Sequence, residues 1–241
     1  MKPTIDVCLS PALFPMFDTK ESIVVVIDVL RATSSICIAF EYGAEMIVPV
    51  ASVEESFAYK SKGFLVGAER QGAMLEGFDF GNSPFSYMQD IIKGAKISLT
   101  TTNGTQAINT ARNAHKIAIG SFLNLDSLCN WLRVQNRNVL CLCSGWKNSF
   151  NLEDTLCAGA IAEQLKDDFD LSDFRDATLA AQHLYNAAKN DIYKFLEESS
   201  HRKRLSRLNI NDDVIFCLKP NQTNVVPVLK GNALYNENIN N

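Results

Sequence analysis

The chain has 241 residues, of which 46% are hydrophobic and 21% are charged, and its formal net charge is −4. This composition is ordinary for a globular protein with a full hydrophobic core and excludes a largely disordered chain. The acidic balance argues against a general nucleic-acid binder, because affinity for phosphate backbones requires a basic surface. The first residues lack the apolar core of a signal peptide and no apolar run is as long as a membrane span. We therefore expect a cytoplasmic protein without a membrane partner.

The seven cysteines are an odd number, scattered along the chain and mostly set among apolar neighbours. Cys141 and Cys143 stand too close together for a structural zinc site and have no companion pair. We therefore expect reduced thiols that act as small hydrophobic side chains.

The N-terminal part of the chain predicts two strands and a helix. Residues 5–9 alternate apolar and polar, which predicts an edge strand, and a loop with two prolines follows it. The apolar run at 24–27 predicts a strand buried on both faces. Residues 34–42 then predict a helix that ends at Gly43.

Asp28 stands where the buried strand leaves the sheet, and polar residues follow it at the mouth of the helix. Arg31, Thr33 and Ser34 lie where free backbone N–H groups and the positive end of the helix dipole favour an anion. A carboxylate, an arginine and a hydroxyl-capped helix together suit a metal ion and a phosphate. The alternative is that Asp28 only caps the turn and that Arg31 pairs with it.

A second strand is predicted at 46–51, a helix begins with the capping residue Ser52, and a short third strand is predicted at 63–67. The segment 67–84 then contains four glycines and reads as a long irregular loop. Loops of this length at the carboxyl end of an α/β sheet are usually functional.

The ionisable side chains of this loop are Glu69, Arg70, Glu76 and Asp79. Together with Asp28, its carboxylates are the hard oxygen ligands that suit Mg²⁺, and we expect a subset of the four to bind the ion. Asn82 and Ser83, followed by a proline, resemble a helix cap and offer a second place for an anion. The alternative is a solvated acidic loop with turn glycines.

A comparison of the chain with itself indicates an internal βαβα duplication. A shift of 72 residues aligns identical residues in the same strand, loop and helix order: Thr33 with Thr105, Ile36 with Ile108, and Ala39 with Ala111. We predict one domain over residues 1–241, with repeats at about 23–95 and 96–165 and a C-terminal helix and strands at 166–241. The expected fold class is α/β, a three-layer α/β/α arrangement with largely parallel or mixed sheets and two similar intertwined halves. Chance resemblance between two βα units is the alternative.

Two further strand ends carry candidate ligands of a substrate. The second repeat offers Asn103, Gly104 and Thr105, which supply N–H and O–H donors without charge. A strand at 138–143 is followed by Ser144, Gly145 and Lys147 and then by a helix through Leu165. Glu153 and Asp154 in the first turn of that helix are explained by the helix dipole alone.

The C-terminal part predicts an amphipathic helix from Ala177 to about Leu208 that becomes basic at 201–207. Cations in the last turns of a helix are expected on dipole grounds, so we do not interpret the patch as a nucleic-acid site. Strands are predicted at 214–218 and 225–229, and the asparagine-rich tail from Asn232 is expected to fray.

Several of these stretches, in fixed order, resemble the 2-phosphosulfolactate phosphatase family over essentially the whole chain. They are Asp28–Thr33, Gly67–Arg70, Glu76–Pro84, Thr101–Thr105, Cys143–Gly145, Leu152–Asp154, Ser200–His201, Asp213–Cys217 and Val226–Pro227. The resemblance implies Mg²⁺-dependent hydrolysis of (R)-2-phospho-3-sulfolactate to sulfolactate and phosphate, a step of coenzyme M biosynthesis. It also implies a three-layer α/β fold. Residues 146–148 match no fixed family pattern, so the substrate could differ there.

Under this hypothesis the catalytic residues are Asp28, Arg31 and Arg70, and the metal ligands come from Asp28, Glu69, Glu76 and Asp79. The expected substrate-binding residues are Thr33, Asn82, Ser83, Asn103, Gly104, Thr105, Ser144, Gly145 and Lys147. Attack by metal-bound water and direct attack by Asp28 both stay open. We interpret His201 as a surface residue rather than a general acid.

The expected partner is a small anionic phosphorylated acid, and assembly into a homo-oligomer is left open. The rival hypotheses are a phosphatase for another 2-phosphorylated acid and a non-catalytic protein that binds a phosphorylated metabolite.

Overall fold

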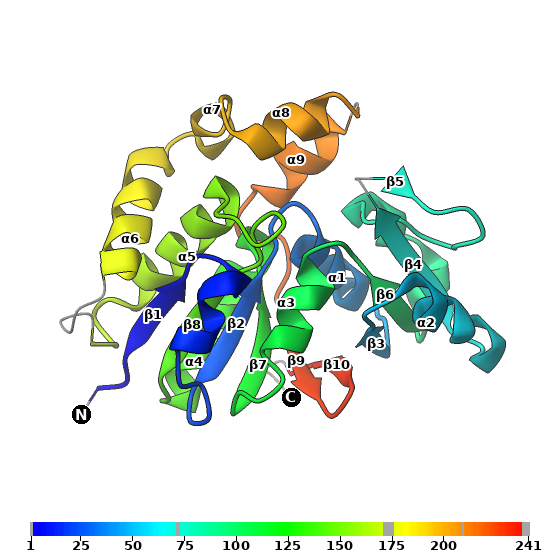
Figure 1. The fold of residues 1–241 in the computed structure, drawn as a ribbon, viewed down its shortest axis with the longest axis horizontal. Coiled ribbons are helices and arrows are strands. Elements are labelled where there is room, and N and C mark those ends of the chain that lie inside the picture. The colour runs from blue at the N-terminus through cyan, green and yellow to red at the C-terminus, as the bar shows by residue number, and fades with distance from the viewer. Residues whose placement is uncertain (1, 71–72, 171–175, 209, 238–241) are drawn as a thin grey trace.

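A computed structural model of the chain describes residues 2–70, 73–170, 176–208 and 210–237. Within these ranges, ten strands form one mixed sheet in the order β1-β8-β2-β7-β9-β10-β3-β6-β4-β5 (Figure 1). The strands are β1 Ile5–Cys8, β2 Ile23–Ile27, β3 Met46–Pro49, β4 Leu65–Arg70, β5 Ala73–Met74, β6 Lys96–Thr100, β7 Lys116–Gly120, β8 Val139–Cys143, β9 Pro227–Lys230 and β10 Ala233–Asn236. The predicted α/β fold class is confirmed, and β1 is an edge strand as expected.

The sheet consists of two parallel blocks joined by an antiparallel hairpin. The strands β1, β8, β2 and β7 are parallel to one another, and so are β3, β6 and β4. The hairpin of β9 and β10 lies between the blocks and is antiparallel to β7 on one side and to β3 on the other. The first strand of each predicted repeat pairs with strands of the other repeat, since β2 lies between β7 and β8 while β6 lies between β3 and β4.

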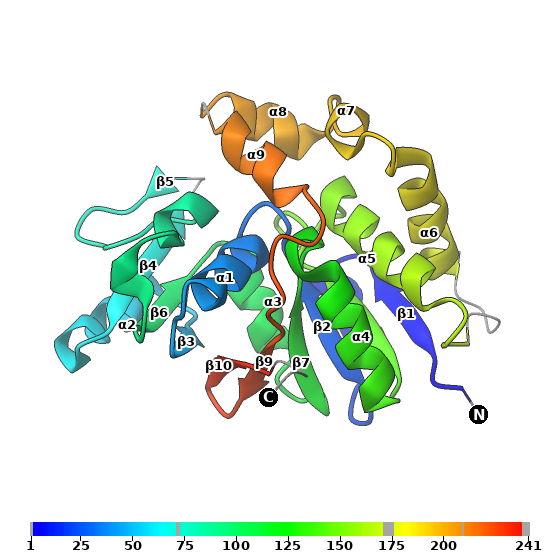
Figure 2. The ribbon, with the colours of Figure 1, turned by 180° about the vertical axis from the view of Figure 1, so that it is seen from behind.

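Helices lie on both sides of the sheet (Figures 1 and 2). They are α1 Ala32–Glu41, α2 Val53–Ala58, α3 Gly104–Thr110, α4 Leu125–Gln135, α5 Leu152–Leu165, α6 Asp176–Ala188, α7 Ile192–Phe195, α8 Ser200–Ser206 and α9 Asn211–Cys217. The alternation of side chains along β2 divides the interior. Val24 and Val26 belong to the core that includes α1 and α3, whereas Ile23, Val25 and Ile27 belong to the core that includes α4 and α5. This burial on both faces fixes the position of Asp28 at the end of β2.

The predicted C-terminal helix from 177 to 208 was wrong in its continuity. The chain instead forms α6, α7 and α8, because two polar side chains cap new helices. Asp191 accepts a hydrogen bond from the Lys194 N–H at 2.9 Å, and Ser199 accepts one from the Arg202 N–H at 3.2 Å. The breaks let α7, α8 and α9 cross the top of the view in Figure 1, beyond the ends of the strands.

Three further predictions of secondary structure were wrong. Residues 214–217 belong to α9 rather than to a strand, and Leu218 caps its end. Val214 and Cys217 are buried at helical spacing, and a short apolar run does not distinguish a helix from a strand. The tail from Asn232 includes β10, since Gly231, at φ +62°, turns the chain back onto β9. The loop at 67–84 begins later than expected, because β4 continues to Arg70 and pairs with β5.

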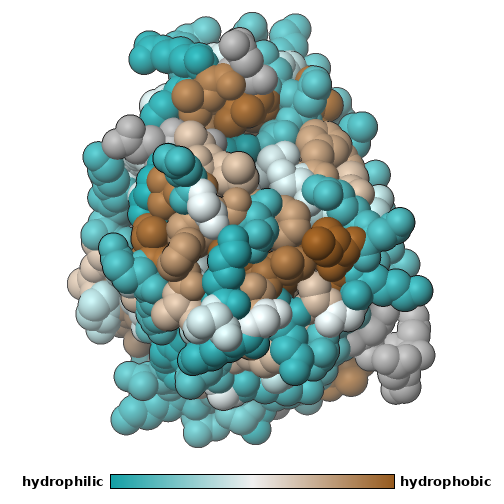
Figure 3. Space-filling view, turned by 90° about the vertical axis from the view of Figure 1, so that its right-hand side faces the viewer, coloured by the Kyte–Doolittle hydropathy of each residue, from teal (hydrophilic) through white to brown (hydrophobic). Residues whose placement is uncertain are grey.

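The surface at the end of the molecule that carries α2, β4 and β5 is mixed in character. Figure 3 shows hydrophilic side chains over much of this face, interrupted by groups of hydrophobic ones. Phe57 of α2 and Met74 of β5 are among the exposed large hydrophobic residues. Within the described ranges, no helix is long and apolar enough to cross a bilayer. All seven cysteines are buried and unpaired, as expected.

Candidate active site

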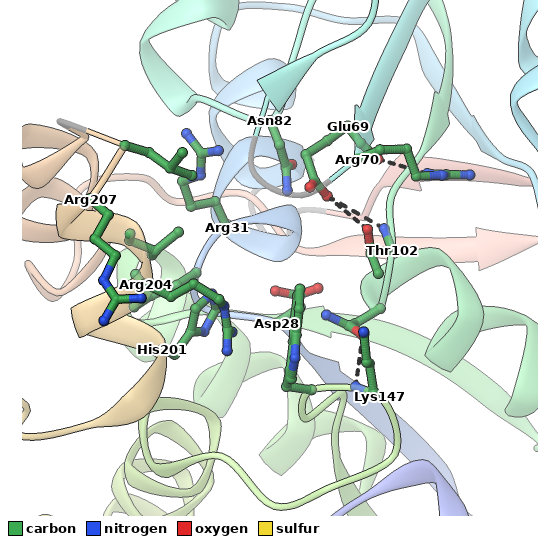
Figure 4. A pocket seen from close by; sticks show the side chains of 15 residues that line it. Asp28, Arg31, Glu69, Arg70, Asn82, Thr102, Lys147, His201, Arg204 and Arg207 are labelled. Atoms are coloured by element: carbon green, nitrogen blue, oxygen red, sulfur yellow. Dashed lines mark hydrogen bonds between the residues drawn. The ribbon is translucent and has the colours of Figure 1, made fainter.

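A cavity of about 680 Å³ lies where several parallel strands end and α8 faces them (Figure 4). Asp28 follows β2, Glu69 and Arg70 end β4, and Thr102 and Asn103 follow β6. The other lining residues are Leu30, Arg31, Asn82, Trp146, Lys147, His201, Arg204, Leu205, Arg207 and Leu208. The carboxyl edge of a sheet is where α/β proteins bind ligands, and the volume suits a small molecule.

Asp28 is the most central carboxylate of the cavity and is 7% exposed. Its backbone N–H donates a hydrogen bond to the Thr33 hydroxyl at 3.1 Å, which fixes the end of β2 against α1. Burial raises the pKa of Asp28 to about 6. The charge of His201 opposes this shift and the charge of Glu69 adds to it. Because Asp28 is buried, water does little to stabilise its ionised carboxylate, and a bound cation would stabilise it instead.

Arg31 lies at the start of α1 and is held by α9. Its guanidinium forms an ion pair with Asp213, and both side chains are buried. Asp213 also accepts a hydrogen bond from the Ser83 hydroxyl at 3.0 Å. The arginine is thus placed at the cavity by a partner almost two hundred residues away in the sequence.

Glu69 and Arg70 bring the end of β4 to the same cavity. A carboxylate oxygen of Glu69 accepts a hydrogen bond from the Thr102 hydroxyl at 3.3 Å. The guanidinium of Arg70 donates to the Glu69 carbonyl at 2.7 Å and to the Thr100 hydroxyl at 3.3 Å. These bonds tie the ends of β4 and β6 together, so Glu69 faces Asp28 from the second parallel block.

The structure places two members of the predicted metal set, Glu76 and Asp79, away from the cavity. Asp79 accepts a hydrogen bond from the Val66 N–H at 2.9 Å and pairs with Lys60 at 3.2 Å, so its carboxylate supports the edge of the sheet. Glu76 is exposed. Neither residue lines the cavity. The turn after β5 carries both side chains away from the strand ends, which a count of carboxylates in a loop does not reveal.

Three of the predicted substrate-binding residues, Asn82, Asn103 and Lys147, line the cavity. The Lys147 N–H donates to the Asn103 side-chain oxygen at 3.3 Å, which joins the loops after β6 and β8. The side-chain oxygen of Asn82 is buried and has no hydrogen-bond partner among the described residues. A buried acceptor of this kind at a cavity wall is suited to a ligand or an ion.

The remaining predicted residues lie behind the cavity wall. Thr33 and Thr105 use their hydroxyls to accept the N–H groups of Asp28 and Thr101, both at the ends of strands. A Cβ at Gly104 would stand 2.8 Å from a carboxylate oxygen of Asp28, so only glycine permits this close approach. The others support loops. Ser83 donates to Asp213, Gly145 donates its N–H to Asp154 at 3.1 Å, and Ser144 donates its N–H to Ile27 at 2.8 Å.

Asp154 is a buried support for two of the loops rather than a partner of the helix dipole alone. It accepts hydrogen bonds from the Val29 N–H at 2.9 Å and from the Asn151 side chain at 2.8 Å. Burial raises the pKa of Asp154 well above its ordinary value, and the charges of Glu153 and Asp28 add to the shift. The carboxyl group therefore fixes the distance between the ends of β2 and β8.

The wall contributed by α8 was not identified from the residues. The interpretation of His201 as a surface histidine was wrong, because the ring is buried and pairs through Nδ1 with the buried Glu153 of α5. Arg204 stacks on the Trp146 ring at 3.7 Å. A signal existed in the resemblance, whose motifs contain Glu153 and His201, but spacing does not show that these two elements meet.

Charge distinguishes this cavity from an ordinary apolar pocket. Among the described residues, its lining carries five arginine and lysine side chains, Arg31, Arg70, Lys147, Arg204 and Arg207, against the carboxylates of Asp28 and Glu69. The chain as a whole has a net charge of −4. The cavity is thus a local cationic site on an acidic protein, which suits a small molecule with several negative charges.

Comparison with known proteins decides which class of site this is. The family model described as 2-phosphosulpholactate phosphatase matches residues 8–232. The chain belongs to this family. A protein named probable 2-phosphosulfolactate phosphatase from Caldanaerobacter subterraneus subsp. tengcongensis is 37% identical over 88% of this chain and 90% of its own length. One from Thermotoga petrophila is 40% identical over 85% and 88%, respectively, and one from Clostridium novyi is 34% identical over 92% and 95%.

The predicted resemblance is therefore confirmed over nearly the whole chain. Members of this 2-phosphosulfolactate phosphatase family are phosphoric monoester hydrolases, and this chain is an enzyme of that class. The cationic cavity at the ends of β2, β4 and β6 is its candidate active site.

Proposed function

We propose that this enzyme hydrolyses (R)-2-phospho-3-sulfolactate to 3-sulfolactate and phosphate, with Mg²⁺ as its cofactor. The observation that carries the proposal is the cavity of about 680 Å³ whose described lining holds five arginine and lysine side chains together with the buried Asp28. The substrate has a phosphate, a sulfonate and a carboxylate on three carbons. Its negative charges are too many for a neutral pocket, and they match the excess of arginine and lysine here.

The side chains present are suited to Mg²⁺. This ion usually takes one or two protein carboxylates and completes its octahedron with waters and substrate phosphate oxygens. Among the residues that the structure describes, no group of three or more His, Cys, Asp or Glu side chains is placed to hold a metal. Asp28 and Glu69 supply two carboxylates, and the unpartnered Asn82 oxygen supplies a third hard donor. When bound, the ion would polarise the phosphoryl group and lower the pKa of a coordinated water.

The other residues act on the phosphoryl group and on the rest of the substrate. Arg31, which is fixed by Asp213, would stabilise charge on the phosphoryl oxygens as it develops. Asn103 and Lys147 would bind the same group from the opposite loops. Arg204 and Arg207 are left for the sulfonate or the carboxylate, because they belong to the wall across from the strand ends. We place the reaction in the cytoplasm and in a pathway of the coenzyme M biosynthesis type.

The proposal is tested by phosphate release from a panel of 2-phosphorylated acids. The panel contains 2-phosphosulfolactate, 2-phospholactate, 2-phosphoglycerate and glycerol 2-phosphate, each with Mg²⁺ and with EDTA. We expect the highest kcat/KM for 2-phosphosulfolactate and loss of activity in EDTA. A higher value for a sulfonate-free acid would assign the enzyme to another substrate. Binding without turnover of any of the four would identify a non-catalytic protein instead.

A further inference from the structure

Of the cavity's described lining residues, His201 is the one histidine, and its ring is held from behind. Its Nδ1 pairs with Glu153, which is fully buried. Within the described residues, Nε2 makes no hydrogen bond, and it is the ring nitrogen left for a ligand in the cavity. A histidine fixed at one nitrogen by a buried carboxylate can present a proton at the other nitrogen in a defined direction.

Glu153 has few other ways to balance its charge. Its second partner is the Asn151 amide at 3.0 Å, and its other carboxylate oxygen is buried with no hydrogen-bond partner among the described residues. A buried carboxylate without a hydrogen-bond partner is costly, so the contact with His201 Nδ1 holds the imidazole against Glu153. Arg204 of α8 is a further charged group that acts on Glu153, and Asp28 at the end of β2 is a second acidic group that acts on the His201 ring.

The surroundings of the ring limit contact with bulk water. The Trp146 ring lies 5.9 Å from the His201 ring, centroid to centroid, and the Arg204 guanidinium stacks on the same indole. Figure 4 places His201 beside Arg204 and across from Glu69 and Thr102, with Asp28 at the cavity centre. When a phosphoryl group is bound at Asp28, its ester oxygen can point toward the strand ends or toward α8. A proton donor, His201, is available on the α8 side.

We propose that His201 is the general acid that protonates the leaving oxygen of the substrate, and that Glu153 is the positioning residue that orients its ring. This inference rests on the proposed function. It explains why a histidine and a glutamate that are 48 positions apart are buried together at a site where cations already supply the binding of anions.

The bond between phosphorus and the C2 oxygen breaks, and its electron pair stays on that oxygen, which takes the proton from Nε2 of His201. The oxygen of a water molecule forms the new bond to phosphorus and keeps both its protons, which gives dihydrogen phosphate. Dihydrogen phosphate then returns one proton to His201 and leaves as hydrogen phosphate, so the enzyme is restored.

The test compares two esters that differ in the bridging atom. One is 2-phosphosulfolactate, and the other is its analogue with sulfur in place of the bridging oxygen. An alkoxide needs a proton to leave, whereas a thiolate, with a parent pKa of about 8.5, leaves without one. His201→Gln should lower kcat on the oxygen ester by about 100- to 10 000-fold. On the sulfur ester it should change kcat by no more than about threefold, and Glu153→Gln should show the same split with a smaller loss.

The matched control is His183→Gln, because His183 is exposed on α6 and should affect neither ester. Thermal unfolding of each variant separates misfolding from a lost proton donor. An equal loss on both esters would overturn the inference and leave His201 with a structural role. No loss on the oxygen ester would also overturn it, while the proposed function would stand. If the wild-type enzyme hydrolysed neither ester, the proposed function itself would fail and the inference with it.

Discussion

The two walls of the cavity are built in different ways. The strand-end wall, with Asp28 and Glu69, is fixed by backbone hydrogen bonds at the ends of parallel strands. The helix wall consists of α8, a helix of seven residues, and the residues directly after it. It contributes His201, Arg204 and Arg207. Carboxylates at the ends of a rigid sheet suit the binding of a metal ion, which in turn would hold the reacting phosphoryl group. Long cationic side chains on a short helix suit recognition of the remainder of the substrate.

The strand-end wall also marks how far the sequence alone could predict the site. A buried apolar run that ends in a carboxylate located Asp28, because parallel strands bring their carboxyl ends to one edge. The same reasoning placed Asn103 and Lys147 correctly at the cavity. It did not show that Asp79 lies outside the cavity, since the direction of this side chain depends on contacts with Lys60 and β4 that spacing does not encode.

The helix wall was not predicted because its contacts join residues that lie far apart in the sequence. Nothing local indicates that His201 meets Glu153 or that Asp213 meets Arg31. A basic helix end has the same pattern whether it faces solvent or a cavity. The corresponding errors in secondary structure, the uninterrupted helix and the strand at 214–218, hid the turn that brings α8 over the strand ends.

The largest expected effect is in the strand-end wall. Asp28→Asn should lower kcat by at least about 100-fold, because it removes the central charge of the site. The same variant should be more stable in EDTA at pH 7. Burial raises the pKa of Asp28 to about 6, so ionisation of this carboxyl destabilises the fold. The wild type therefore loses stability as pH rises from about 4 to 6, and the asparagine variant does not. Denaturant unfolding should show a gain of about 2–3 kcal/mol for the variant.

These two results are informative together. A loss of activity together with a loss of stability would indicate damage to the fold. It would contradict the claim that the ionised Asp28 carboxylate destabilises the folded protein. At pH 4, where the wild-type carboxyl is protonated, the difference in stability between the two proteins should become small.

The next effect concerns the link between the walls. Asp213→Asn keeps a hydrogen bond to Arg31 but removes the charge, and we expect kcat to fall about 10-fold with a stability loss of about 1–3 kcal/mol. Asp212→Asn, at an exposed neighbouring position of α9, is the matched control. Equal kinetics for the two variants would show that the ion pair with Asp213 does not position Arg31.

A smaller effect is expected in the helix wall. Arg204→Gln should raise KM for 2-phosphosulfolactate about 10-fold and leave kcat within about twofold, because a charge-assisted contact to the substrate is lost in ground state and transition state alike. Lys203→Gln, whose side chain pairs with Glu198 on the exposed side of α8, should match the wild type. A fall in kcat without a change in KM would assign Arg204 to the chemical step. It would contradict the claim that Arg204 only binds substrate.

The most direct measurement is the Mg²⁺ concentration that gives half-maximal phosphate release from 2-phosphosulfolactate, for Glu69→Gln and for Asp79→Asn. Both variants remove one negative charge. Glu69, at the end of β4, lines the cavity and faces Asp28, whereas Asp79, after β5, pairs with Lys60 outside it. We predict that Glu69→Gln needs at least about 10-fold more Mg²⁺ and that Asp79→Asn behaves as the wild type, since Mg²⁺ takes few protein carboxylates. An equal shift in both variants, or in neither, would contradict the assignment of the site to the carboxylates at the strand ends.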